Sequence, residues 1–312
     1  MSDVLSVTWR TSAVKSDLNK GSNAGWTTLR KTPRRFPRKA KPNVRRWWAR
    51  VRNYDARVRA ELAAAHAAVD EAVAILQDRR AKPHERIDKA AKDFLTDVDL
   101  ASESALRCSL AASTPDIGFY GEEGGGAPLD SGKVWVADPL DGTINYATGS
   151  PLCGVMLGLL EDGVPTVGVI DLPFLGVRVD SGAVVDVGSF EDGIIGMGDA
   201  FHRGGARLDA FLELTMSVHR RALRFRCVGA ASVLWTWLVR GQIQGMVLAH
   251  NNPYDVVAGH AIARAAGAIC TDYAGAPLTL DSPGAMAAVP GVQSELVSLA
   301  RDLAATAARE DL

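Results

Sequence analysis

Residues 134–151 read VWVADPLDGTINYATGSP, and this stretch carries the strongest signal for both the fold and the site. Its apolar start at 134–137 predicts a short strand. After the strand, Pro139 sets φ at about −65° for a turn, and Gly142 tolerates a positive φ. The carboxylates of Asp138 and Asp141, on either side of Pro-Leu, can then face the same side of the loop. One turn is therefore predicted to offer two oxygen ligands.

Three further carboxylates stand where the chain must turn at the end of a strand or helix: Asp97, Glu122 and Asp255. None of the five acidic residues has a Lys or Arg within two positions. If they converge, their mutual repulsion raises their pKa values unless divalent cations supply the missing charge. Oxygen ligands without His or Cys favour Mg²⁺ or Mn²⁺ over zinc. For each residue taken alone, an ordinary turn or helix-cap role is the alternative.

The rest of the chain falls into helices and strands around this turn. Helices are predicted over 54–80, ending before Pro83, and over 99–110. β-branched segments between turns predict an antiparallel meander at 152–160, 164–170, 176–180 and 183–187. Beyond 188, strands are predicted at 194–197, 223–227, 246–249, 268–272 and 286–289, and helices at 206–218, 230–240, 256–266 and 292–308. This order predicts a layered α/β sandwich with two lobes, 51–188 and 189–312.

Three motifs together resemble the inositol monophosphatase superfamily of magnesium-dependent, lithium-sensitive phosphomonoesterases. They are GEE at 121–123, WVADPLDGTINYATGSP at 135–151 and PYDVVAGHAIARAAGA at 253–268, which match that superfamily in order and spacing. The resemblance covers about residues 55–310. It implies the layered αβαβα sandwich of the inositol monophosphatase/fructose-bisphosphatase type, and a homodimer.

The resemblance also implies the roles of individual residues. Two or three Mg²⁺ ions are expected on Glu122, Asp138, the Leu140 carbonyl, Asp141 and Asp255, with Asp97 near a third, weaker site. Thr143 and Asp97 are expected to orient and deprotonate the attacking water, assisted through the metal by Glu122. Backbone N–H groups of Gly142 and Thr143 are expected to hold phosphate oxygens. This chemistry is an in-line displacement at phosphorus without a covalent intermediate.

The substrate-recognition segment departs from the family pattern. The family usually has an acidic residue seven positions before the last metal-binding Asp, where it binds substrate hydroxyls. Here that position is Leu248, so a polyol contact is missing. The segments 162–176 and 249–255 look more like the histidinol-phosphatase branch. His250, Asn251 and Asn252 are either substrate contacts or a polar loop before a helix. Arg226 matches a basic position near the substrate or the dimer interface, with a structural salt bridge as the alternative.

Composition and charge limit the remaining function classes. The 312 residues are 47% hydrophobic and 23% charged, which is typical of a folded protein. No apolar run approaches the roughly 20 residues of a membrane helix. Residues 1–50 hold 13 Lys or Arg against two acidic residues, which predicts a disordered basic arm. One hypothesis is that the arm contacts nucleic acid or an anionic membrane. The alternative is that it is a solvated tail or results from a mis-assigned start codon.

Four cysteines, at 108, 153, 227 and 270, lie far apart without a C-x-x-C pair and in apolar surroundings. They are predicted to be buried, reduced thiols, which is typical of the cytoplasm.

Hydrolysis of a small alcohol phosphate, of the inositol monophosphate or histidinol phosphate type, is the function that these observations favour. A 3′-phosphoadenosine nucleotidase or fructose-bisphosphatase-like activity is an alternative within the same superfamily. A catalytically silent regulatory paralogue is a third reading, and the intact metal motifs argue against it. A nucleic-acid-binding protein that uses the arm is a fourth, but the chain lacks a recognition fold. No membrane partner is expected.

Overall fold

The computed structural model describes residues 56–82, 85–90, 93–130, 132–182, 184, 187–199 and 205–310. These residues belong to one compact unit that spans 44–312. The predicted basic arm at 1–50 lies outside the described residues, as does most of the strand predicted at 183–187. Within the described part, no helix combines the length and the apolar character needed to cross a bilayer.

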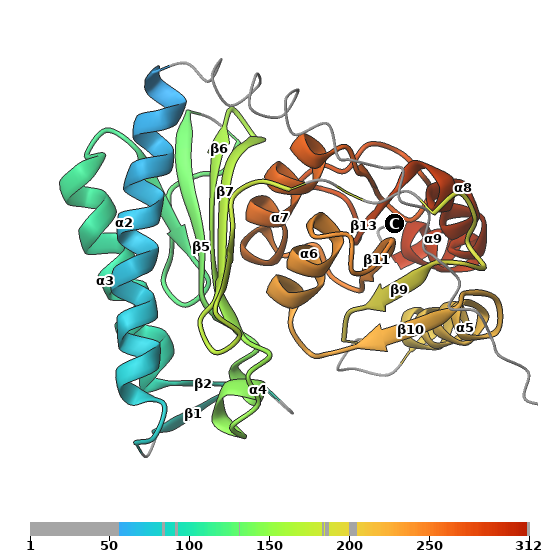
Figure 1. The fold of residues 1–312 in the computed structure, drawn as a ribbon, viewed down its shortest axis with the longest axis horizontal. Coiled ribbons are helices and arrows are strands. Elements are labelled where there is room, and N and C mark those ends of the chain that lie inside the picture. Colours follow the sequence, from blue (N-terminus) through green and yellow to red (C-terminus); the bar gives the residue numbers. More distant parts are fainter. Residues whose placement is uncertain are drawn as a thin grey trace, which may run out of the picture. The chain divides into compact units, whose positions relative to one another are not determined.

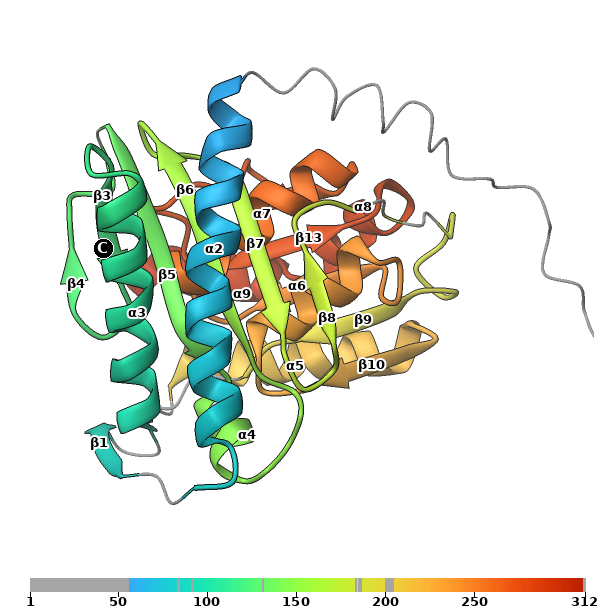
Figure 2. The ribbon, with the colours of Figure 1, turned by 60° about the vertical axis from the view of Figure 1, so that its left-hand side comes forward.

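Two helices cover one face of a six-stranded sheet (Figures 1 and 2). Helix α2 (Ala56–Arg79) buries Ala65, Val69, Ala72 and Leu76, whose spacing forms one helical face. Helix α3 (Asp97–Ser113) packs beside α2 and against β5. The sheet contains, in chain order, β3 (Gly118–Gly121), β4 (Gly125–Gly126), β5 (Lys133–Asp141), β6 (Gly154–Glu161), β7 (Val164–Leu172) and β8 (Val177–Val179).

The spatial order of this sheet is β4-β3-β5-β6-β7-β8. Strands β5 to β8 pair antiparallel in chain order, which confirms the predicted meander up to β8. Strand β3 instead pairs parallel with β5, so the end of β3 lies beside the middle of β5. This pairing brings the loop after β3 to the turn at the end of β5.

The opposite face of this sheet is covered by α6 (Ala231–Val239) and α7 (Pro253–Ala266). Glycines at 158 on β6 and 168 on β7 let α7 lie directly on the strands. A Cβ added at these positions would come within 2.7 Å and 2.2 Å of the Ala258 backbone. Such distances leave no room for any side chain, so the close approach of α7 requires glycine at both positions.

A second sheet lies beyond these helices, in the order β10-β9-β11-β13-β12. Its far face packs against α5 (Ala206–Arg221), α8 (Pro290–Leu299) and α9 (Arg301–Glu310). The layers therefore follow the predicted αβαβα order, as Figure 1 shows. The strands are β9 (Ile194–Met197), β10 (Arg224–Cys227), β11 (Gly245–Leu248), β12 (Ile269–Thr271) and β13 (Ala285–Ala288).

Several elements differ from the sequence prediction, among them β3 and β4, where no strand is predicted. The strands β1 (Arg86–Ala90) and β2 (Asp93–Thr96) form an antiparallel hairpin that was not predicted, because their polar sequence carries no alternating pattern. The helix predicted at 292–308 is instead two helices separated by Ala300. Ala300 is fully buried, and Leu296 and Leu303 on either side of the break both lie in the core under the second sheet.

All four cysteines are free thiols, as predicted, but their burial differs from the prediction. Cys153 is buried and Cys270 is partly buried. Cys108 and Cys227 are exposed, so the prediction of burial is wrong for these two. An apolar neighbourhood in the sequence does not reveal that Cys108 lies on the outer side of α3, or that Cys227 ends an edge strand.

Candidate active site

The turn at the end of β5 presents two carboxylates, as its sequence predicts. The ladder between β5 and β6 is interrupted between Asp138 and Asp141, and the backbone N–H of Leu140 donates to Asp138 Oδ1 at 3.0 Å. Gly142 ends the turn at φ 81°, where a Cβ would lie 3.0 Å from the Leu152 carbonyl oxygen. The left-handed backbone and the tight space both require glycine at this position.

Two helix N-termini orient the carboxylates of the site. The first turn of α6 holds Asp141, whose Oδ1 accepts from Ala231 N at 3.1 Å and whose Oδ2 accepts from Ser232 N at 2.7 Å and from the Ser232 hydroxyl. Asp255 lies in the first turn of α7, and its Oδ2 accepts from Asn252 Nδ2 at 2.9 Å. Carboxylate oxygens of Asp138, Asp141 and Asp255 lie within 4.8 Å of one another. Residues more than 110 positions apart thus form one cluster.

A buried glutamate shapes the loop that carries Glu122. The carboxylate of Glu103 on α3 accepts from Glu123 N at 2.8 Å and from Gly124 N at 3.1 Å. It lies so close to the loop that a Cβ on Gly121 would fall 2.3 Å from it. The loop places Glu122 on the wall of a cavity of about 410 Å³ that Asp138, Asp141 and Asp255 also line.

The site has a strong excess of negative charge. Burial, followed by the charge of neighbouring carboxylates, raises the pKa of Asp138 well above its usual range and that of Asp255 to about 8. Burial also raises the pKa of Asp141 to about 6, although hydrogen bonds from α6 oppose the shift. No Lys or Arg is among the described residues that line the cavity. This set of acceptor oxygens without a counterion fits a hard divalent cation.

We expect the metal-free protein to lose stability as the pH rises from about 4 to about 8. Asp141 and Asp255 have folded-state pKa values of about 6 and about 8, above the ordinary 3.8, so the folded state holds more protons than the unfolded state in this range. Thermal unfolding in EDTA should show a falling Tm over this range. Mg²⁺ should raise the Tm more at pH 8.5 than at pH 5.5, and a pH-independent Mg²⁺ effect would contradict the assignment.

Thr143 contacts a different aspartate from the one predicted. Its Oγ1 lies 3.0 Å from Asp99 Oδ1 and 3.1 Å from the Leu140 carbonyl oxygen, and no hydrogen bond joins it to Asp97. Asp99 is fully buried, and burial raises the pKa of its carboxyl group. Its other oxygen accepts from Thr96 N at 2.8 Å and from Thr96 Oγ1 at 2.6 Å. The predicted Thr143–Asp97 pair is therefore a Thr143–Asp99 pair.

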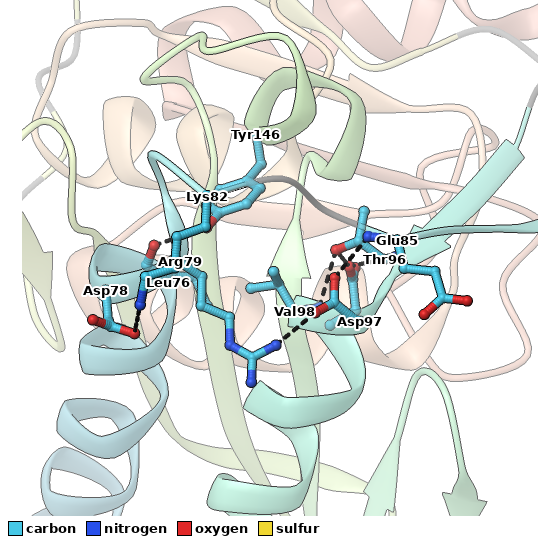
Figure 3. Close-up of polar contacts among 10 residues, drawn as sticks. Leu76, Asp78, Arg79, Lys82, Glu85, Thr96, Asp97, Val98 and Tyr146 are labelled. Carbon is cyan, nitrogen blue, oxygen red and sulfur yellow. Dashed lines mark hydrogen bonds and ion pairs between the residues drawn. The ribbon is translucent and has the colours of Figure 1, made fainter.

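Asp97 instead fastens the β1–β2 hairpin to the end of α2, as Figure 3 shows. Its Oδ2 lies 2.5 Å from Arg79 Nη1, and its Oδ1 accepts from Glu85 N at 3.0 Å. Asp97 does not line the described cavity. The sequence did hold a signal for Asp99: the T-x-x-D spacing of Thr96 and Asp99 is that of a capping box, which the start of α3 forms.

The predicted substrate contacts separate into two groups. His250 and Asn252 line the cavity, with the Asn252 amide also holding Asp255. Asn251 and Arg226 do not line it. The Asn251 amide donates to the carbonyl oxygens of Thr279 and Leu280 at 2.9 Å and 3.0 Å, and Arg226 is exposed on the edge strand β10. Gly142 and Thr143, predicted to bind phosphate, both line the cavity.

Comparisons with known proteins agree with this geometry. The model of the inositol monophosphatase family matches residues 58–305. The chain is 38% identical to the inositol-1-monophosphatase ImpA of Mycolicibacterium smegmatis, over 68% of this chain and 82% of that protein. It is 33% identical to a histidinol-phosphatase of Mycobacterium tuberculosis, over 53% of this chain and 64% of that protein.

A solved structure supports the fold. The extragenic suppressor protein SuhB from Bartonella henselae superposes with a TM-score of 0.70 at 23% identity, covering 76% of this chain and 97% of that one. The family model, the identity to ImpA and the cluster of carboxylates lead to one conclusion: the chain belongs to the inositol monophosphatase family and is a phosphatase.

Proposed function

We propose that the protein is a Mg²⁺-dependent phosphomonoesterase that hydrolyses a small alcohol phosphate by direct attack of water. The observation that carries this proposal is the convergence of Asp138, Asp141 and Asp255, with Glu122 on the wall of the same cavity. An anionic substrate would be repelled by such a site unless cations neutralised it. The inositol-1-monophosphatase and histidinol-phosphatase relatives favour leaving alcohols of those two types.

Glu122, Asp138, the Leu140 carbonyl, Asp141 and Asp255 would hold two or three Mg²⁺ ions, and Mn²⁺ has the same ligand preference. When bound, the ions neutralise the phosphate, activate water and stabilise the leaving oxygen. The Ser232 and Asn252 hydrogen bonds keep Asp141 and Asp255 in position for this binding. The predicted role of Asp97 near a third ion is not part of this proposal, because Asp97 pairs with Arg79.

The pair of Thr143 and Asp99 supports a role in orienting the nucleophile. Asp99 accepts a hydrogen bond from the Thr143 hydroxyl, which leaves the lone pairs of Thr143 Oγ1 free to accept from a water molecule. As that water attacks phosphorus, its proton can pass to Oγ1 while the Thr143 proton moves towards Asp99. Backbone N–H groups of Gly142 and Thr143 are proposed to hold the phosphate, which the same cavity would accommodate.

Two further properties extend the proposal. The family resemblance supports a homodimer, which light scattering would test. The four free thiols support a reducing, cytoplasmic location.

Phosphate release from a panel of monoesters, with Mg²⁺ and with excess EDTA, tests the proposed function. The panel contains inositol monophosphate, histidinol phosphate, fructose 1,6-bisphosphate and 3′-phosphoadenosine 5′-phosphate. We expect turnover of the first or second ester, lost in EDTA and restored by Mg²⁺ or Mn²⁺. Equal turnover in EDTA would contradict the metal mechanism. A preference for either of the last two esters would contradict the proposed substrate class.

A further inference from the structure

The ends of two neighbouring strands meet at the active-site cavity. Strands β9 and β11 pair in parallel, with Met197 opposite Val247, and Gly198 N donates to the Val247 carbonyl oxygen at 2.7 Å. Leu248 is the last residue of β11, and Asp199 lies two residues beyond the end of β9, so both stand at the same edge of the second sheet. Both line a cavity of about 170 Å³, which shares Asp141 and Asp255 with the larger one.

Leu248 cannot contribute a polar contact at this edge. Its side chain is only 6% exposed and packs against the backbone of Gly198, where an added Cβ would lie 3.1 Å from Leu248 Cδ2. Its carbonyl oxygen already accepts from the Tyr273 hydroxyl at 2.9 Å. Leu248 thus forms an apolar wall where the family pattern leads us to expect a carboxylate.

Asp199 places a carboxylate beside that wall. It is exposed and lines both cavities, and its carboxylate lies beside Gly229: a Cβ there would lie 3.6 Å from Asp199 Oδ2. Asp199 Oδ1 accepts a hydrogen bond from the Cys227 thiol, a weak donor, with Sγ at 3.9 Å. Among the described residues, Asp199 forms no ion pair. Most of its acceptor capacity therefore faces the cavity.

We propose that Asp199 is a specificity-determining residue, whose carboxylate accepts hydrogen bonds from a hydroxyl or ammonium group of the leaving alcohol. It supplies, from the loop after β9, the acidic contact that position 248 on β11 lacks. This inference rests on the proposed function, because the alcohol extends towards Asp199 only if the phosphate binds at the cations that the carboxylates would hold. Recognition of polyols then no longer depends on an acidic residue at position 248.

The test compares Asp199→Ala and Asp199→Asn with the parent protein on three esters: inositol monophosphate, histidinol phosphate and phenyl phosphate. The first offers hydroxyl donors, the second an ammonium group, and the leaving group of the third offers no donor. We expect Asp199→Ala to lower kcat/KM about 10- to 100-fold for the donor-bearing ester that the parent prefers. Turnover of phenyl phosphate by Asp199→Ala should change less than about twofold. The control is Asp192→Ala, which removes an exposed acidic residue in the loop before β9, and its turnover of every ester should also change less than about twofold.

Asp199→Asn distinguishes the two donor classes. Its amide keeps one acceptor oxygen but loses the charge, so activity on a hydroxyl-bearing ester should largely survive, whereas an ammonium-bearing ester should lose as much as with Asp199→Ala. An equal loss on all three esters, or no loss on the donor-bearing ones, would overturn the proposal. Circular dichroism and Tm of each variant show whether it folds like the parent, so that a loss of activity through misfolding is recognised.

Calorimetric binding of the same esters in Ca²⁺ separates this inference from the proposed function. A parent protein that binds a donor-bearing ester but releases no phosphate would contradict the proposed function only. In that case, a drop in affinity of about tenfold or more in Asp199→Ala would still support the contact. If the parent protein neither binds nor hydrolyses any of the esters, both the proposed function and this inference are contradicted.

Discussion

Replacement of Asp255 by Asn is expected to lower Mg²⁺ affinity and kcat by about 100-fold or more while the fold survives. Asn keeps the volume of the side chain and an oxygen that can accept from Asn252, but it removes one of the charges that attract the cation. The pKa of Asp255, about 8, means that its ionisation costs stability without metal. The Tm of the variant in EDTA should therefore equal or exceed that of the parent at pH 8.5.

A matched control is Asp209→Asn, which changes an exposed acidic residue in the first turn of another helix, α5. Its Mg²⁺ dependence and kcat should match those of the parent. Mg²⁺ titrations of activity and calorimetric binding measure both variants. Equal effects at 209 and 255 would show that the carboxylate cluster is not the metal site.

The second large effect is expected at the Thr143–Asp99 pair. Thr143→Val keeps the shape of the side chain but removes the hydroxyl, and Asp99→Asn keeps a hydrogen-bond acceptor but removes the base. Both should lower kcat about 100-fold or more, with a smaller change in KM, because they remove proton transfer rather than substrate binding. Steady-state kinetics with Mg²⁺ at saturation isolate this effect from metal affinity. A double variant that is no slower than either single variant would indicate that the two residues act as a unit.

Asp97→Asn is the discriminating control for this prediction. Asp97 pairs with Arg79 at the protein surface, where its side chain is 35% exposed. Loss of such a pair changes the free energy of unfolding by about 1 kcal/mol or less. We expect kcat to stay within about threefold of the parent. If Asp97→Asn were the slower enzyme and Asp99→Asn the faster, the partner seen by Thr143 in the structure would not be its partner in catalysis.

Much of the fold could be predicted because its signals are local. The spacing of small and aliphatic residues in α2 predicts a helix, and the β-branched segments from β6 to β8 predict the meander. The hairpin of β1 and β2 could not be found in this way, since neither RIDKA nor DFLT alternates apolar and polar residues over the length of a strand. The break at Ala300 likewise depends on how two helices wrap one core.

The chemistry of the site follows from local sequence, because the Asp-Pro-Leu-Asp-Gly turn aims both Asp138 and Asp141 to one side through its own backbone geometry. Which other groups reach that turn depends on the tertiary structure. It joined Thr143 to Asp99 rather than Asp97, turned Asn251 towards residues 279–280, and brought Asp199 beside Leu248. These contacts depend on strand pairing and helix packing between distant segments, which the local sequence around each residue does not specify.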